Sequence, residues 1–273
     1  MLLFPNAKIN LGLHVTGKRT DGYHTIETIF YPIPLTDALE AVKSENTSFT
    51  SSGIDIESSP EDNLVMKAYR LLQKKYKLPP LDIYLKKAIP SGAGLGGGSS
   101  DAAFMLKLLN DLCECDIKDQ KLEEIAATIG ADCPFFIRNT PVIATGTGNI
   151  FKPSTVSLKG YTLLLVKPPV AVSTKEAYSD VTPQKPAFSL EKLPSIPVHE
   201  WKDVLVNDFE ASVFKKYPVI GDIKNKIYAM GAEYAAMSGS GSAVFGLFKE
   251  PAILGLTKNT ISPNCFIWKG TLE

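Results

Sequence analysis

The sequence is poor in cysteine, and its cysteines are not spaced for metal binding. The four of them, Cys113, Cys115, Cys133 and Cys265, form no CxxC pair. Neither a zinc site nor a disulfide framework is therefore indicated, and a cytoplasmic location is expected because the cytosol keeps thiols reduced. The opening residues, MLLFPNAK, also lack the charged-then-apolar pattern of a secretion signal.

Net charge and long apolar runs are missing as well. Lysine plus arginine equals aspartate plus glutamate at 29 each, which argues against nucleic acid or an anionic membrane as the main partner. No apolar run approaches the roughly 20 residues of a transmembrane helix. With 44% hydrophobic residues, the chain of 273 residues can bury a sizeable core in one large domain or two smaller ones.

Glycine, by contrast, is concentrated in one stretch, residues 90–103, which reads PSGAGLGGGSSDAA. The alternating apolar residues at 81–86 predict a strand before this stretch, and the spacing of apolar residues at 102–109 predicts a helix after it. The cap of that helix is expected to be Ser99, Ser100 or Asp101.

A glycine-rich turn from a strand into a helix favours an anion. Glycine lets the backbone approach a ligand, and the first amides of a helix are unpaired and carry partial positive charge, so phosphate is the usual occupant. No lysine follows the glycines, which excludes the GxxxxGK[ST] phosphate loop. Gly92, Gly94 and Gly97 satisfy GxGxxG, but no acidic residue ends a following strand, so a dinucleotide site lacks support. A flexible turn without a ligand would leave so many glycines unexplained.

Polar residues on the first strand are candidates for chemistry. Residues 9–15 alternate in a way that predicts a strand with Lys8 and Asn10 on its polar face. A turn then leads to His24 and a second strand. From position alone, Lys8 fits a solvated lysine and His24 fits a turn residue bonded to its own backbone.

Asp132 has two interpretations that the residues alone leave open. It precedes Pro134, which can begin a helix, so its carboxylate fits an N-cap. A carboxylate at this place equally fits a base held beside a phosphate site.

The remaining patterns mix strands and helices without strict alternation. Helices are expected at residues 64–72, 122–129, 201–214, 218–230 and near 252–256, and strands at 161–166, 243–248 and 265–268. A linker is expected at 153–160, and the four prolines of 183–197 predict irregular structure there. The pattern indicates an α+β protein.

Three motifs together carry a resemblance to a known family. PNAKINLGL stands near the start, PSGAGLGGGSSDAA in the middle and MSGSGSAVFG late in the chain. This order, over nearly the whole chain, resembles that of the GHMP small-molecule kinases. Residues 5–30 and the motif GADCPFF closely resemble those GHMP kinases that phosphorylate the 2-hydroxyl of a cytidine diphosphate-linked methylerythritol for isoprenoid synthesis. Two positions depart from that pattern: Ser91 stands where an apolar residue is common, and Cys133 stands where valine is common.

The resemblance implies a two-domain fold and ATP as the phosphate donor. Residues 1–155 would form an N-terminal ATP-binding domain like domain 2 of ribosomal protein S5, and residues 156–273 a ferredoxin-like C-terminal domain. The glycine stretch would cradle the triphosphate, and Lys87 would lie near the adenine. The residues that the resemblance assigns to ATP are Asn63, Leu64, Lys87, Pro90, Gly92, Gly94, Leu95, Gly96, Gly97, Gly98, Ser99 and Ser100.

The resemblance also assigns the chemistry and the acceptor. Asp132 matches the catalytic base and Lys8 its charge partner, which are groups that phosphoryl transfer can use. Magnesium should bridge the phosphates; the sequence does not identify its protein ligands, although Ser99 or Ser100 is a candidate. The implied substrate contacts are Asn10, Tyr23, His24, Thr174 and Tyr178, with the cytosine ring between the two tyrosines.

Two other functions fit parts of the pattern. Another GHMP kinase, acting on homoserine or mevalonate, would share the glycine stretch, but the segment GKRTDGYH with Tyr178 suits a flat base better than a small aliphatic acid. A non-catalytic ATP-sensing relative would not need both Lys8 and Asp132. The expected partner is a small molecule, and the expected assembly is a monomer or a homodimer.

Overall fold

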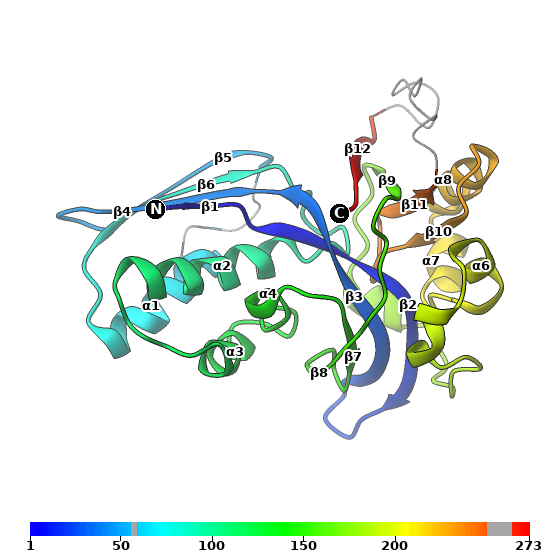
Figure 1. Cartoon of the computed structure of the whole chain (residues 1–273), viewed down its shortest axis with the longest axis horizontal. Coiled ribbons are helices and arrows are strands. Elements are labelled where there is room, and N and C mark those ends of the chain that lie inside the picture. Colours follow the sequence, from blue (N-terminus) through cyan, green and yellow to red (C-terminus); the bar gives the residue numbers. More distant parts are fainter. Residues whose placement is uncertain (56–58, 60, 250–263) are drawn as a thin grey trace. The chain divides into compact units, whose positions relative to one another are not determined.

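The computed structural model describes residues 1–55, 59, 61–249 and 264–273 (Figure 1). These residues form two compact units, each assembled from several segments. Unit 1 comprises Met1–Lys8, Leu35–Ser91 and Gly96–Thr140, and unit 2 comprises Ile9–Pro34, Gly92–Leu95 and Pro141–Glu273. Both units combine strands with helices, so the α+β prediction is confirmed. The helix expected near 252–256 lies outside the described residues.

Unit 1 contains a four-stranded sheet with helices on one face (Figure 1). The strand order is β1 (Leu2–Leu3), β4 (Ala38–Lys43), β6 (Leu81–Lys87) and β5 (Ser48–Gly53). Strands β5 and β6 run parallel, and the other neighbours run antiparallel. The predicted alternation in β6 is confirmed, because Leu81, Ile83 and Leu85 are all buried.

The helices of unit 1 include one whose first turn has a side-chain cap. They are α1 (Leu64–Tyr76), α2 (Gly97–Leu112), α3 (Asp119–Ala127) and α4 (Phe135–Arg138). Asn63 caps α1, because its Oδ1 accepts a hydrogen bond of 2.9 Å from the Val65 amide.

Helix α2 starts earlier than the sequence predicts. Its N-cap is Gly96, which has a left-handed φ of 70° and makes no side-chain cap. The first helical hydrogen bond runs from the Ser100 amide to the Gly96 carbonyl at 2.8 Å. Ser99, Ser100 and Asp101 therefore lie inside the helix, and the prediction that one of them caps it is wrong.

Unit 2 contains two four-stranded sheets. The first has the order β2 (Asn6–Lys18), β3 (His24–Thr36), β7 (Val142–Thr145), β8 (Ile150–Pro153). Residues 6–8 of β2 and 35–36 of β3 belong to unit 1. The second has the order β10 (Tyr234–Met237), β11 (Val244–Phe248), β9 (Thr162–Lys167), β12 (Phe266–Thr271), and its neighbours are antiparallel.

The helices of unit 2 are short. They are α5 (Thr174–Tyr178), α6 (Trp201–Val204), α7 (Glu210–Lys216) and α8 (Pro218–Ala229), with 3-10 turns at Leu190–Ser195 and Val198–Glu200. The single helix predicted at 201–214 is wrong. The segment between α6 and α7 is extended and bonds to β2, because the Leu13 amide donates to the Val206 carbonyl and the Asp208 amide to the Leu13 carbonyl, both at 2.9 Å.

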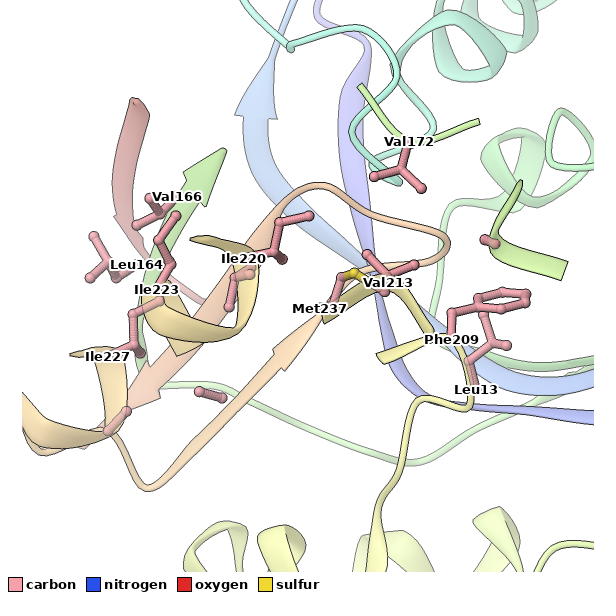
Figure 2. Packing of buried hydrophobic residues seen from close by; sticks show 14 of the residues in the cluster. Leu13, Leu164, Val166, Val172, Phe209, Val213, Ile220, Ile223, Ile227 and Met237 are labelled. Atoms are coloured by element: carbon pink, nitrogen blue, oxygen red, sulfur yellow. The ribbon is translucent and has the colours of Figure 1, made fainter. Parts of the chain in front are cut away.

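The core of unit 2 lies between α8 and its neighbouring strands (Figure 2). Ile220, Ile223 and Ile227 recur at helical spacing and belong to the same buried cluster as Leu164 and Val166 of β9. This apolar face fixes α8 on the sheet. Among the described residues, no helix combines the length and the apolar character needed to span a membrane.

Candidate active site

The start of α2 brings the first and second motifs together within unit 1. A Cβ added at Gly96 would lie 2.9 Å from Cζ of Phe136 and 3.3 Å from Cγ of Lys8. The amides of Gly97 and Ser99 precede the first helical hydrogen bond, so they have no partner within the helix. This arrangement suits an anion close to Lys8.

Lys8 and Asp132 form an ion pair in the same unit. Lys8 Nζ lies 3.8 Å from Asp132 Oδ2, and the exposed fractions of the two side chains are 4% and 34%. Burial lowers the pKa of Lys8, and the charge of Asp132 opposes that shift. The interpretation of Lys8 as a solvated lysine is therefore wrong.

Asp132 does not cap a helix. Helix α4 begins at Phe135 with Pro134 as its N-cap, and it has no side-chain cap. The carboxylate of Asp132 is instead partly exposed and paired with the buried ammonium of Lys8. The structure thus excludes the N-cap interpretation and leaves the group accessible for chemistry.

Ser99 connects α2 to the turn that carries Asp132. Its hydroxyl and the thiol of Cys133, the residue after Asp132, face the same point: a Cβ added at Gly130 would lie 3.9 Å from Ser99 Oγ and 3.2 Å from Cys133 Sγ. Burial raises the pKa of Cys133 to about 11, so this cysteine is a neutral thiol at physiological pH and not a nucleophile.

The other residues that the resemblance assigns to ATP surround the start of α2 in unit 1. Leu64 Cδ1 would lie 3.7 Å from a Cβ at Gly98, which places the start of α1 beside the start of α2. Pro90 is buried, and Ser100 Oγ is a buried atom for which the described part of the chain holds no hydrogen-bond partner. Lys87 is buried too, and its Nζ donates to Asp101 Oδ2 at 2.6 Å and to Asp37.

The first arm of the glycine stretch, Gly92–Leu95, belongs to unit 2, where it packs on the third motif. A Cβ at Gly94 would lie 1.9 Å from the carbonyl oxygen of Ser238, so only glycine fits there. Ser238 Oγ donates to the Gly94 carbonyl at 2.8 Å and accepts from the Asn10 amide at 3.2 Å. The motif MSGSG is part of the family resemblance, but the sequence alone does not indicate that it holds Gly94 and Asn10.

Asn10 is held on both its backbone and its side chain. It is 2% exposed, and its Nδ2 donates to Thr28 Oγ1 at 3.0 Å. Thr28 Oγ1 in turn donates to the Gly12 carbonyl. No sequence pattern singled out Thr28, because it is one polar residue among several on β3.

The residues proposed for the cytosine are only partly assembled. The rings of His24 and Tyr178 are stacked, with centroids 4.6 Å apart and an interplanar angle of 15°. Phe209 meets Tyr178 edge-on at 4.7 Å. His24 is the first residue of β3, so the interpretation of it as a turn residue is wrong. Tyr23 is 68% exposed, and Thr174, the first residue of α5, is exposed as well.

Comparisons with known proteins agree with the motifs. Residues 63–140 match the family described as GHMP kinases N terminal domain, and residues 196–255 match GHMP kinases C terminal. The chain is 62% identical over 273 residues to the 4-diphosphocytidyl-2-C-methyl-D-erythritol kinase of Parabacteroides distasonis, with 100% of both chains covered.

Solved structures give the same result. The crystal structure of a 4-(cytidine 5'-diphospho)-2C-methyl-D-erythritol kinase matches with a TM-score of 0.82 and 30% identity, covering 100% of this chain and 99% of that one. The mevalonate kinase of Methanococcus jannaschii matches with a TM-score of 0.70 and 14% identity, covering 100% and 98%, which is a likeness of fold alone. The resemblance seen in the sequence is thereby confirmed, and the chain belongs to the 4-diphosphocytidyl-2-C-methyl-D-erythritol kinase family of the GHMP kinases.

Proposed function

We propose that this kinase transfers the γ-phosphate of ATP to the 2-hydroxyl of 4-diphosphocytidyl-2-C-methyl-D-erythritol in the non-mevalonate isoprenoid pathway. The observation that carries the proposal is the pairing of buried Lys8 with partly exposed Asp132 next to the start of α2. A carboxylate and an ammonium beside a set of amides without helical partners match the needs of phosphoryl transfer. The family supports the choice of acceptor.

In the proposed reaction, Asp132 accepts the proton of the acceptor hydroxyl as that oxygen attacks the γ-phosphorus. The bond between the γ-phosphorus and the bridging oxygen breaks at the same time and ADP leaves. Lys8, held in the interior, attracts the negative charge that develops on the transferring group. The amides of Gly97 and Ser99 bind phosphate oxygens at the positive end of α2.

Magnesium fits this site as an ion that arrives with the nucleotide. In the part of the chain that the structure describes, no group of three or more His, Cys, Asp or Glu side chains could hold a metal ion. Mg²⁺ keeps several waters in kinase sites and binds largely to phosphates, so it does not need such a group. When bound, the ion neutralises charge on the phosphates that the start of α2 holds.

For the acceptor, the stacked pair of His24 and Tyr178 supports a base-binding role in unit 2. Because His24 covers one face of the Tyr178 ring, we propose that the cytosine stacks against this pair and that the exposed Tyr23 closes over the base from the other side. Asn10 and Thr174 are proposed to contact the rest of the substrate.

Removing either tyrosine ring is expected to weaken binding of the cytidine substrate. Tyr23→Ala and Tyr178→Ala should each raise the KM for that substrate by roughly 5- to 100-fold, the range implied by loss of one base stack. The KM for ATP should stay nearly unchanged, because the phosphate-binding residues are elsewhere. Steady-state kinetics with each substrate varied in turn would measure both values.

The control for this experiment is Tyr178→Phe, which keeps the ring. Tyr178 packs against Phe209 and the core of unit 2, so a melting curve must accompany Tyr178→Ala. Tyr23 is 68% exposed and offers a variant with little effect on stability. A wild-type KM in both alanine variants would show that the tyrosines do not bind the base.

A comparison of acceptors tests the function itself. Purified protein with ATP and Mg²⁺ should release ADP with the cytidine substrate and not with homoserine or mevalonate. ADP release with homoserine or mevalonate alone would support another GHMP kinase. ATP binding with no turnover on any of the three would support the sensing relative.

We also propose a division into an ATP-binding domain at residues 1–155 and a second domain at 156–273. The matches to the two GHMP domain families, at 63–140 and 196–255, fall inside these limits. A monomer or homodimer in the cytoplasm is the proposed assembly, and light scattering would measure its mass.

A further inference from the structure

Unit 1 contains a buried cluster of one cation and two carboxyl groups near the start of α2. Lys87 ends β6, Asp37 immediately precedes β4, and Asp101 lies in the second turn of α2. Their exposed fractions are 5%, 1% and 2%. Lys87 Nζ donates to Asp101 Oδ2 at 2.6 Å and also to Asp37 Oδ2. Three elements distant in the sequence therefore meet at one ammonium.

Asp37 also fixes the chain that leads into the glycine stretch. Its Oδ1 accepts hydrogen bonds from the amides of Ala88 and Ile89, at 2.6 and 2.8 Å. These two residues follow β6 and precede Pro90. Asp37 thus uses both carboxylate oxygens, one on the backbone before the loop and one on Lys87.

Lys87 and Ile89 lie directly against the other end of the loop. A Cβ at Gly97 would lie 2.8 Å from Ile89 Cγ2 and 3.4 Å from Lys87 Nζ. One helical turn after Gly97, Asp101 holds the same ammonium. The cluster therefore joins the residues just before the glycine stretch to the residues where the stretch becomes α2.

Such a cluster is a poor source of stability, because the desolvation of buried charges offsets their attraction. Burial, opposed by the charge of Lys87 and assisted by that of Asp37, raises the pKa of Asp101 to about 8. Although burial lowers the pKa of Lys87, the charges of Asp101 and Asp37 raise it above its usual value. Lys87 is thus a cation at neutral pH, held by hydrogen bonds to both carboxyl groups.

We propose that Asp37 and Asp101 are positioning residues for ATP, which act through Lys87 to hold both ends of the glycine stretch in the geometry that receives the phosphates. The proposal rests on the proposed use of ATP as the phosphate donor. It gives Lys87 a role in shaping the loop, because both neighbouring carboxyl groups engage its ammonium. None of the three residues is proposed to take part in the chemical step.

The two carboxyl groups should respond differently to replacement by amides. Asp37 accepts on both oxygens, whereas an asparagine has one acceptor and would turn its NH₂ group toward either Lys87 or the backbone amides. Asp101 accepts only on Oδ2, and its Oδ1 is a buried atom without a hydrogen-bond partner among the described residues. An asparagine at 101 can therefore keep the bond to Lys87, whereas leucine cannot.

The test measures ATP binding directly, by calorimetry without acceptor, and then the KM values and kcat. Asp37→Asn and Asp101→Leu should each weaken ATP binding by roughly 10-fold or more, the scale of one charge-assisted hydrogen bond. Asp101→Asn should recover most of the loss seen in Asp101→Leu. The KM for the cytidine substrate and kcat at saturating ATP should change by less than about threefold, since positioning of ATP is the affected step.

The matched control is Glu40→Gln, an exposed acid-to-amide change on β4 of the same unit, which should leave ATP binding at the wild-type value. ATP binding by Asp37→Asn and Asp101→Leu equal to that of Glu40→Gln would overturn the proposal. An equal loss for both substrates would also overturn it, because a general structural role predicts that result. If Asp37→Asn does not fold, the comparison of Asp101→Leu with Asp101→Asn decides alone.

The binding measurement keeps this proposal distinct from the proposed function. A wild type that binds ATP but does not phosphorylate the cytidine substrate would refute the acceptor, and the variants would still decide the role of the cluster. A wild type that does not bind ATP would overturn both.

Discussion

Replacing Asp132 by asparagine is expected to lower kcat by roughly 10²-fold or more, the usual scale for loss of a general base. The amide cannot take the proton of the acceptor hydroxyl. Lys8 would also lose the charge that opposes the lowering of its pKa. Because Asp132 caps no helix and its side chain is 34% exposed, we expect the variant to fold. Coupled ADP release, with a melting curve beside it, would measure the effect, and the KM for ATP should stay within about threefold.

The matched control for this variant is Asp111→Asn. Asp111 is an exposed acid near the far end of α2 in the same unit, so the chemical change is the same and the site is untouched. Its kcat should equal that of the wild type. A near-normal kcat in Asp132→Asn would show that the carboxylate only compensates the charge of Lys8.

The sequence predicted best those helices and strands whose positions depend on residues close together in the chain. The alternation of β6 and the apolar spacing of α1 depend on side chains close to one another in the chain. The start of α2 was misplaced because serine and aspartate are common caps. In the structure, Gly96 provides the left-handed turn and the helix starts at Gly97.

The pairing of Lys8 with Asp132 could not be read from local pattern. The alternation of β2 correctly put Lys8 on the face opposite the apolar residues, but an alternating strand does not reveal whether its polar face is exposed. In the structure both faces are buried, and Lys8 is 3% exposed. Only the family resemblance joined the two residues, and the geometry now supplies a physical reason for that link.

The residues that support the site were the ones that sequence reasoning missed. Asp37 and Thr28 belong to no motif, and Ser238 lies in the third motif without a role assigned to it; each acts by hydrogen bonds to distant backbone or side chains. A single acid before a strand or a single threonine within one has many possible partners. Such contacts are set by tertiary packing, which periodicity does not encode.

The glycines at the start of α2 differ in what they allow, and this governs how the ATP site is tested. Gly96 has a left-handed φ of 70°, and a Cβ there would lie 2.9 Å from the Phe136 ring. Valine at this position would strain the backbone and displace Phe136, so the fold itself would be affected. Gly98 is exposed, and its added Cβ would meet only Leu64 at an ordinary 3.7 Å. Alanine is also the better helix former, so Gly98→Ala leaves the fold intact.

Gly96→Val is therefore expected to abolish ATP binding and also to lower the melting temperature. Gly98→Ala is expected to weaken ATP binding by roughly 10-fold, about one hydrogen bond to a charged phosphate, while the melting temperature stays constant or rises slightly. The reason is that a methyl group on the first turn of α2 keeps phosphate away from amides that have no helical partner. Calorimetric titration of both variants and the wild type, with ATP and with NADH, would measure these effects. Wild-type ATP affinity in Gly98→Ala would show that the phosphates do not bind at the start of α2. Binding of NADH without ATP by the wild type would restore the dinucleotide interpretation of GxGxxG.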